Sequence, residues 1–254
     1  MMDNFNTIGL IIQARTSSTR LPDKMLLPFY NQETILDLVI EKLQLKFSQS
    51  QIILATTTNS KDDLLEYVAL KHSIPFYRGD ENNVLKRFID CANHYKVDHI
   101  IRVCADNPFL DIDLLYDLID SVNFNTTDYA SYMIKEVPSI KTHFGFFAEY
   151  VSLEALKKVQ SNTNDVFFLE HVTNFIYANP SMFKICWKSV PILIVENIGV
   201  RLTVDTIDDF DACKLIYKDL VLQKQLNYFS IINYINLHRN IKEQMLIQIQ
   251  RHEK

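Results

Sequence analysis

Short apolar runs alternate with amphipathic stretches along the first half of the chain. The apolar runs favour buried strands, and the amphipathic stretches repeat apolar residues at a helical period. The pattern predicts strands at Ile8–Gln13, Gln51–Thr56, Ile74–Tyr77 and His99–Cys104, and helices at Thr34–Phe47, Lys61–His72, Asn82–Tyr95 and Asp111–Val122. Because strands joined through helices usually run parallel, we expect an α/β fold with a largely parallel sheet covered on both faces.

The second half of the chain has a looser pattern. It predicts strands at Tyr129–Ile134, Phe144–Tyr150 and Val200–Val204, helices at Leu153–Val159 and Val166–Tyr177, a helix from about Asp208, and a mostly helical tail at Gln223–Lys254. No repeat or low-complexity linker interrupts the chain. We therefore expect one domain over residues 1–222, with residues 223–254 as a helical C-terminal appendage of the same domain.

Composition limits the partners that the chain can have. The 254 residues include 48% hydrophobic ones and carry a net charge of −5, so a sizeable core is expected, with neither nucleic acid nor an anionic membrane as partner. No apolar leader and no apolar run of about 20 residues is present, which argues against membrane insertion. The scattered cysteines form no metal or redox motif and predict free thiols in a reducing cytoplasm: Cys91, Cys104, Cys186 and Cys213.

The loop after the first predicted strand concentrates positive charge. Arg15, Arg20 and Lys24 surround Ser18 and neighbouring hydroxyl residues in the stretch ARTSSTRLPDK. Guanidinium forks, an ammonium group and backbone N–H groups together suit a nucleotide polyphosphate. The spacing is equally compatible with a solvated basic loop. With 4 glycines in all, the chain has neither a Walker loop nor a dinucleotide GxGxxG motif.

Two aspartates follow predicted strands. Asp106 lies in VCADNPFLD and Asp205 in RLTVDTIDDF. In open parallel sheets ligands collect beyond the carboxyl ends of strands, and two carboxylates converging there suit Mg²⁺ bridging phosphates. The alternative for Asp106 is a turn or cap residue. For Asp205 it is a helix N-cap, with Asp208 and Asp209 then favouring the positive end of the helix.

Several collinear motifs resemble one family over nearly the whole chain. They are IIQARTSSTRLPDKML, ILATTTNSKDDLLEYVALKHSIPFYRGDENNVLKRF, RVCADNPFLD, LEHVTNFIYANPSMF and RLTVDTIDDF. They resemble the spore coat polysaccharide biosynthesis protein F group, which is similar to the CMP-sugar synthetases for Kdo and acylneuraminate. The resemblance implies a three-layer αβα nucleotide-diphospho-sugar transferase fold with a mostly parallel mixed sheet, and a reaction that depends on CTP and Mg²⁺.

The resemblance also implies roles for individual residues. The triphosphate loop would use Arg15, Ser18, Arg20 and Lys24, the metal would be held by Asp106 and Asp205, and Arg78 would contact the nucleotide. The chain departs from the family where Ser17 and Asp23 replace usual glycines. These replacements remove conformational freedom and add a carboxylate beside the phosphates.

The sugar pocket is less well defined by sequence. Glu149 stands at a position that is usually acidic in the family, and Glu170 and His171 are further candidates for substrate contact. The adjacent Glu170 and His171 on an amphipathic helix are also typical of a solvated face. Trp187 is more typical of a core residue than of a platform on which a base stacks.

The predicted activity is transfer of CMP from CTP to an acidic or phosphorylated sugar, with release of pyrophosphate. Arg15, Lys24 and Asp106 are its predicted catalytic residues, and the related synthetases suggest a homodimer. One alternative is a metal-dependent glycosyltransferase, for which DID at Asp111–Asp113 is a formal motif match. Another is a non-catalytic nucleotide-binding subunit. The acceptor sugar and a general base are not identified by the sequence.

Overall fold

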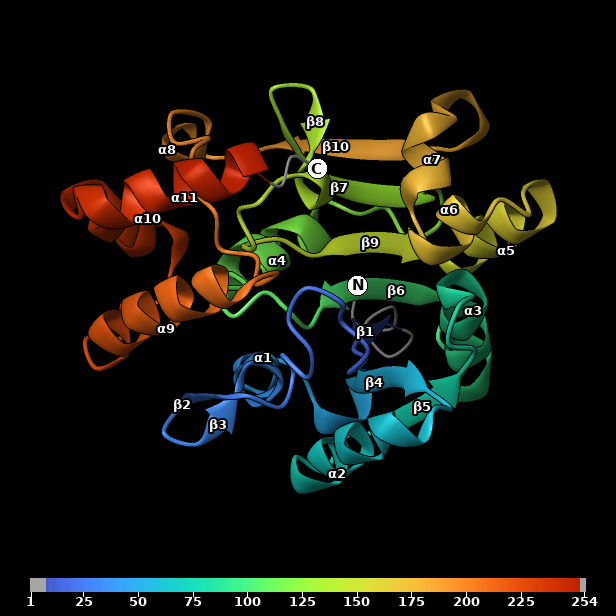
Figure 1. The fold of residues 1–254 in the computed structure, drawn as a ribbon. Coiled ribbons are helices and arrows are strands. Elements are labelled where there is room, and N and C mark those ends of the chain that lie inside the picture. The colour runs from blue at the N-terminus through green and yellow to red at the C-terminus, as the bar shows by residue number, and fades with distance from the viewer. Residues whose placement is uncertain (1–7, 252–254) are drawn as a thin grey trace.

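The computed structural model describes residues 8–251. The strands of its main sheet lie in the order β10-β7-β9-β6-β1-β4-β5, and β8 pairs with β7 (Figure 1). β9 runs antiparallel to β6 and β7, whereas the pairs β1–β4, β1–β6, β4–β5 and β7–β10 are parallel. The predicted mostly parallel mixed sheet is therefore confirmed. Its strands are β1 Ile8–Gln13, β4 Ile52–Thr57, β5 Phe76–Gly79, β6 His99–Cys104, β7 Tyr129–Ile134, β8 Val137–Pro138, β9 Glu149–Ser152 and β10 Ile185–Ser189.

Helices cover both faces of the sheet and give three layers. Alternation along β1 sends Leu10 and Ile12 into one buried core and Ile11 into the other. The larger core is covered by α1 Ile35–Gln44, α2 Asp63–Lys71, α4 Ile112–Asp120, α8 Ile192–Val195, α9 Ile207–Val221, α10 Tyr228–Leu237 and α11 Arg239–Arg251. The smaller is covered by α3 Val84–Tyr95, α5 Leu153–Asn162, α6 Val166–Glu170 and α7 Asn174–Ala178.

Local side-chain chemistry explains where several helices begin. Thr34 caps α1 reciprocally with Asp37, and Asn83 caps α3. A short hairpin, formed by β2 Pro28–Tyr30 and β3 Glu33–Thr34, precedes α1. The predicted first-half elements are therefore present, with boundaries moved by a few residues.

The second half differs from its predicted elements. Val200–Val204 is not a strand, because its amides do not pair with a neighbouring strand: Leu202 N–H donates to His143 O and Val204 N–H to Asp106 O, both in loops. Phe144–Tyr150 yields a strand only from Glu149, because Gly145 has a φ of +67° and lies against the Leu202 backbone. Apolar patterning in both segments reflects burial rather than strand pairing.

Two further differences concern the segment after β9. The predicted helix Val166–Tyr177 is broken into α6 and α7, because His171 leaves the helical conformation with a ψ of 45°. Strand β10 was not predicted. It carries Trp187, which is half-buried and packs edge-on against the Tyr129 ring with centroids 5.6 Å apart.

The C-terminal helices pack against the same core as the sheet. Fully or nearly fully buried side chains from α10 and α11 belong to it: Ile231, Ile232, Ile235, Ile241 and Met245. The last three residues of the predicted helical tail, 252–254, lie outside the described part of the chain. The division into residues 1–222 and 223–254 stays a prediction.

All four cysteines are described and are free thiols. Between residues 8 and 251, every helix is too short or too polar to cross a lipid bilayer.

Candidate active site

A cavity of about 710 Å³ opens beyond the carboxyl ends of β1 and β6. It is lined by five cationic side chains and three carboxylates, in a chain whose net charge is −5. This local excess of positive charge favours an anionic ligand. The charged lining residues are Arg15, Arg20, Lys24, Arg102, Lys141, Asp106, Glu170 and Asp205.

The loop after β1 is closed on a buried carboxylate. Thr16 donates both its backbone N–H and its hydroxyl to Asp62 Oδ1, at 2.8 and 2.7 Å, and Thr57 donates to Asp62 Oδ2 at 2.5 Å. Burial alone would raise the pKa of Asp62, but the bonds from Thr57 and Thr16 outweigh burial and hold the pKa below its usual value. Asp62 thus ties the basic loop to the end of β4.

The two departures from glycine behave differently in this loop. Asp23 has a φ of 55°, in the left-handed region that aspartate tolerates better than most residues. Ser17 is not among the described residues with positive φ, so its backbone does not require glycine. Asp23 N–H also donates to Thr16 O at 3.2 Å, which closes the turn.

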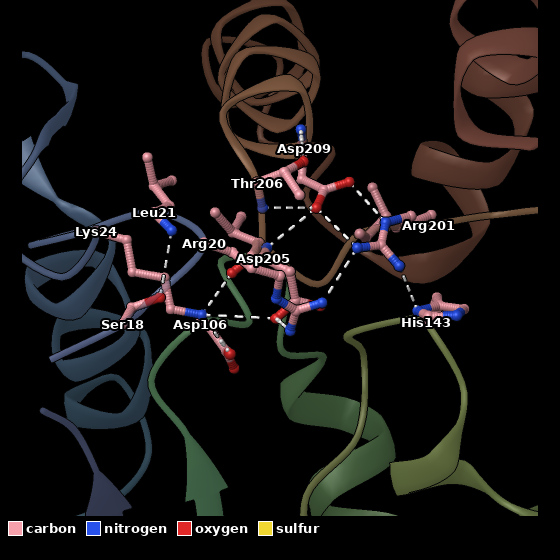
Figure 2. Close-up of polar contacts among 12 residues, drawn as sticks. Ser18, Arg20, Leu21, Lys24, Asp106, His143, Arg201, Asp205, Thr206 and Asp209 are labelled. Atoms are coloured by element: carbon pink, nitrogen blue, oxygen red, sulfur yellow. Dashed lines mark hydrogen bonds and ion pairs between the residues drawn. The ribbon is translucent and has the colours of Figure 1, made fainter. Parts of the chain in front are cut away.

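Lys24 brings the two predicted metal-binding aspartates together. Its Nζ lies 2.8 Å from Asp106 Oδ2 and 3.8 Å from Asp205 Oδ1, and it donates to Val204 O at 2.6 Å (Figure 2). Arg20 Nη2 lies 2.9 Å from Asp205 Oδ1. Burial alone would lower the pKa of Lys24, but Asp106 and Asp205 outweigh burial and raise it, so the ammonium stays charged.

A buried cluster behind Asp205 orients this carboxylate. Arg201 is fully buried, donates to both oxygens of Asp209 at 2.6 and 2.8 Å, and lies 3.3 Å from Asp205 Oδ2 (Figure 2). His143 Nδ1 lies 2.7 Å from Arg201 Nη1. Asp209 also accepts from the backbone of Asp205 and Thr206, so it fixes the turn into α9.

Sequence reasoning did not identify Arg201. The available signal was an arginine inside the apolar run VRLTV, because a buried arginine requires a carboxylate partner.

Two of the predicted sugar-pocket residues line the cavity. Glu170, at the end of α6, receives Arg15 Nη2 at 3.0 Å, and His171 packs edge-on against Phe167 with centroids 4.8 Å apart. Burial lowers the pKa of His171 and favours the neutral imidazole. Both side chains line the cavity after the break in the helix, and Glu170 reaches the basic loop through Arg15.

The third, Glu149, does not reach the cavity. It is 1% exposed and accepts hydrogen bonds from Arg102, Tyr129 and Thr173. Arg102 does line the cavity, so Glu149 stands behind it. The direct contact of Glu149 with substrate stays a prediction, which its burial behind Arg102 does not favour.

Arg78 is also outside the cavity lining. Its guanidinium donates to Thr57 O and Asn59 O at 2.9 and 2.8 Å and pairs with Asp63 and Glu66. These contacts hold the loop between β4 and α2. The structure therefore does not bring Arg78 to the other predicted nucleotide-binding residues.

One other group of ligand atoms is clustered within the described residues. One atom each from Glu33, Asp37 and His72 lie within 4.8 Å of one another. Lys71 Nζ contacts Glu33 and Asp37 at 2.5 and 3.0 Å, and Asp37 completes the α1 capping box. These contacts give the group a structural role at the start of α1.

The fold and the charged cavity define a nucleotidyltransferase. Residues 10–245 match the Cytidylyltransferase family, and the chain belongs to it. It is 30% identical over 241 residues to the spore coat polysaccharide biosynthesis protein SpsF of Bacillus subtilis, covering 91% of this chain and 95% of SpsF. It is 34% identical over 234 residues to the uncharacterized protein MJ1063 of Methanocaldococcus jannaschii, covering 91% of each.

Solved structures agree with this assignment. A cytidylyltransferase from Leptospira borgpetersenii matches with a TM-score of 0.83 at 29% identity, covering 92% of this chain and 96% of that one. A CMP:2-keto-3-deoxy-manno-octonic acid synthetase complexed with CTP matches with a TM-score of 0.63 at 12% identity, covering 84% and 99%. Rv0371c from Mycobacterium tuberculosis, solved as a complex with manganese, has a TM-score of 0.55 at 16% identity, covering 82% and 97%. The last two show the fold alone.

Proposed function

We propose that the protein transfers CMP from CTP to a hydroxyl of an acidic or phosphorylated sugar and releases pyrophosphate, in the biosynthesis of a surface polysaccharide or glycan. The observation that carries this proposal is the convergence of Asp106, Asp205 and Lys24 beneath the basic loop, with Lys24 Nζ 2.8 Å from one carboxylate and 3.8 Å from the other. Such a site provides both polyphosphate binding and a position for a cation.

The basic loop binds the β and γ phosphates. Arg15, Arg20 and Lys24 line the cavity, and each is paired with a carboxylate that an anionic ligand can replace. Ser18 adds a neutral donor on the same loop. Charge neutralisation by these groups stabilises pyrophosphate as it leaves.

The acidic donor set fits a divalent cation. Asp106 and Asp205 present oxygens to the same ammonium group, and Mg²⁺ favours oxygen ligands of this kind. Asp106 and Asp205 would hold Mg²⁺. When bound, the ion supplies charge neutralisation and lowers the pKa of a coordinated hydroxyl.

The reaction is an in-line displacement. The acceptor oxygen forms a bond to the α-phosphorus while the bond from that phosphorus to the bridging oxygen breaks. The electron pair leaves with pyrophosphate, and the hydroxyl proton passes to solvent. The chain contributes chiefly by holding the two substrates in line and neutralising charge. Arg15, Lys24 and Asp106 are its proposed catalytic residues.

The deciding experiment is a calorimetric titration with CTP, UTP, GTP and ATP, each with and without Mg²⁺. Selective binding of CTP that strengthens with Mg²⁺, followed by pyrophosphate release with an acidic or phosphorylated sugar, is the expected result. Preference for another nucleotide would overturn the CMP product, and absence of binding would overturn the nucleotide site.

The glycosyltransferase alternative is not favoured by the local structure. Asp111, the first residue of DID, is 3% exposed and caps α4 by accepting from the amides of Asp113 and Leu114. Its second oxygen accepts from Tyr228 N–H. A carboxylate used in this way has no oxygen directed to the cavity.

The non-catalytic alternative predicts tight CTP binding without pyrophosphate release across a broad acceptor panel. The homodimer also stays a prediction, which light scattering of the purified protein tests.

A further inference from the structure

Arg102 is a cavity-lining cation that the proposed phosphate and metal contacts leave unused. It lies within β6 and is 8% exposed. The phosphate-binding cations come from the loop after β1, whereas Arg102 points toward Glu149 on β9 and hence toward Thr173 beside α7. Asn174 and Tyr177 of α7 line this side of the cavity.

The guanidinium of Arg102 is incompletely bonded by the protein. Nη1 donates to Glu149 Oε2 at 2.7 Å, and the partner of Nη2 among residues 8–251 is Gln13 Oε1 at a long 3.4 Å. Nε is buried and has no hydrogen-bond partner within the same residues. A buried donor without a partner is unusual, and an arginine that keeps unused donors beside a cavity is suited to an anionic ligand.

The sheet holds Arg102 in a fixed orientation. Arg102 and Glu149 are directly opposite one another in the antiparallel pair of β6 and β9, so their side chains share one face. Glu149 is itself fixed by Tyr129 and Thr173 and is closed to the cavity. It therefore orients the guanidinium through one nitrogen and leaves the rest of the fork to other partners.

A second cation lies on the same side of the cavity. Lys141 Nζ is 4.9 Å from the centre of the Tyr177 ring, and Lys141 is exposed. Arg102 lies on β6 and Lys141 follows β8, whereas the other cavity cations lie on the loop after β1. Their presence extends the positive charge beyond the triphosphate site.

We propose that Arg102 is the specificity-determining residue for the acceptor, binding an anionic group of the sugar, and that Glu149 is its positioning residue. This inference rests on the proposed transfer to a sugar. A carboxylate and a phosphate share the required chemistry, since both accept from a guanidinium fork. Arg102 on the sheet then selects the acceptor, whereas the loop after β1 binds the nucleotide.

The test measures sugar binding directly and needs no turnover. Ligand-detected NMR with glucuronate, a 3-deoxy-2-ulosonate, glucose 6-phosphate and neutral glucose is run on wild type and on two variants. Arg102→Lys keeps the buried charge but removes the fork, and Arg102→Met with Glu149→Gln removes both charges together. The matched control, Lys86→Met with Asp90→Asn, removes an exposed ion pair on α3. Excess inorganic pyrophosphate blocks sugars that bind only at the basic loop.

In the presence of pyrophosphate, wild type should bind at least one anionic sugar about tenfold more tightly than glucose, since charge-assisted bidentate bonds are the stronger class. Arg102→Lys should weaken that binding about threefold or more, because a point charge replaces the fork. The double variant should abolish the preference, with CTP affinity unchanged. The responding probes identify the group as carboxylate or phosphate.

Equal binding of glucose and the anionic sugars would overturn the role of Arg102. Retained preference in the double variant would do the same, as would an equal loss in the Lys86→Met and Asp90→Asn control. Far-UV circular dichroism and thermal midpoints show whether each variant is folded. The proposed cytidylyl transfer has a separate test: absence of CTP binding in the nucleotide titration would overturn it, whatever the sugar-binding result.

Discussion

Two sets of ion pairs surround the cavity and differ in exposure. In each cavity pair at least one side chain is partly exposed to solvent. The cavity pairs are Arg15–Glu170, Arg20–Asp205 and Lys24–Asp106. Arg201–Asp209 is a scaffold pair that is closed to solvent, whereas Arg102–Glu149 is buried but keeps Arg102 at the cavity wall. Arg20, with 49% of its side chain exposed, and Arg201, with none, show the extremes.

The difference assigns different tasks to the same chemistry. An exposed ion pair contributes about 0–1 kcal/mol to stability, so a ligand can replace either partner at little cost. Breaking a buried pair costs about 3–5 kcal/mol, because one charge is left without a partner in the interior. We therefore expect changes in the cavity pairs to affect ligands and changes in the Arg201–Asp209 pair to affect the fold, while Arg102, buried and yet cavity-lining, affects the acceptor.

The largest effect is expected at a cavity pair. Asp106→Asn should lower the rate of pyrophosphate release about 1,000-fold, equivalent to about 4 kcal/mol, because a neutral amide is a poor ligand for Mg²⁺. Stability should change less than it does when a fully buried pair is broken, since the Asp106 side chain is 30% exposed and Asp205 stays 3.8 Å from the Lys24 ammonium. Turnover assays and urea unfolding measure the two quantities. Near wild-type turnover would remove Asp106 from the mechanism.

The opposite result is expected at a scaffold pair. Arg201→Met should lower the free energy of unfolding by about 3–5 kcal/mol, because Asp209 is left charged and buried. Adding Asp209→Asn should restore part of the loss by removing that charge. Urea unfolding of the single and double variants provides the measurement. Equal stabilities for wild type and Arg201→Met would show that the scaffold pair does not support the fold.

Between these extremes, Asp62 supports the basic loop without lining the cavity. Asp62→Asn weakens the charge-assisted bonds from Thr16 and Thr57, and we expect CTP affinity to fall about tenfold, or about 1.4 kcal/mol. Asp63→Asn is a matched control, because the Asp63 side chain is 63% exposed and pairs with Arg78. Calorimetry compares the two. Equal CTP affinity in both variants would separate Asp62 from loop function.

The same aspartate predicts a pH dependence. Its folded pKa lies below the usual value for an aspartate, so its stabilising contribution is present above the unfolded pKa and is lost as pH falls through the folded pKa. Asp62→Asn should therefore flatten the stability–pH curve in the acid range, below about pH 4. Urea unfolding at a series of acidic pH values gives the curve. A wild-type slope in the variant would assign the acid loss to other carboxylates.

The sequence predicted the first half of the fold because the hydrophobic periodicity there is clear, and because its strands and helices pack against elements close to them in the chain. It also predicted residues that the structure brings together, since Asp106 follows β6 and the basic loop follows β1. Asp205 lies at the cavity for a different reason from Asp106, which follows a strand. The segment before it is not a strand, and the bond from Val204 N–H to Asp106 O places it there.

The residues that sequence missed depend on long-range pairing. Arg102 meets Glu149 only because β6 and β9 pair in one register, and β10 exists only because it pairs with β7. A charged residue in the middle of the apolar run HIIRVC was the available signal for a buried ion pair. Its partner, 47 positions away, could not be named from local spacing.

The smallest effect is expected at Arg78, where family resemblance and geometry disagree. If Arg78 holds the β4–α2 loop, Arg78→Met should change CTP affinity by less than about threefold, or about 0.7 kcal/mol, because its ion pairs are largely exposed and its contacts lie outside the cavity. Arg20→Met, which removes a cavity-lining guanidinium, should reduce affinity about tenfold in the same calorimetric assay. A loss at Arg78 as large as that at Arg20 would mean that the loop rearranges to bring Arg78 to the nucleotide, and the division between cavity and scaffold contacts would then apply only to the ligand-free protein.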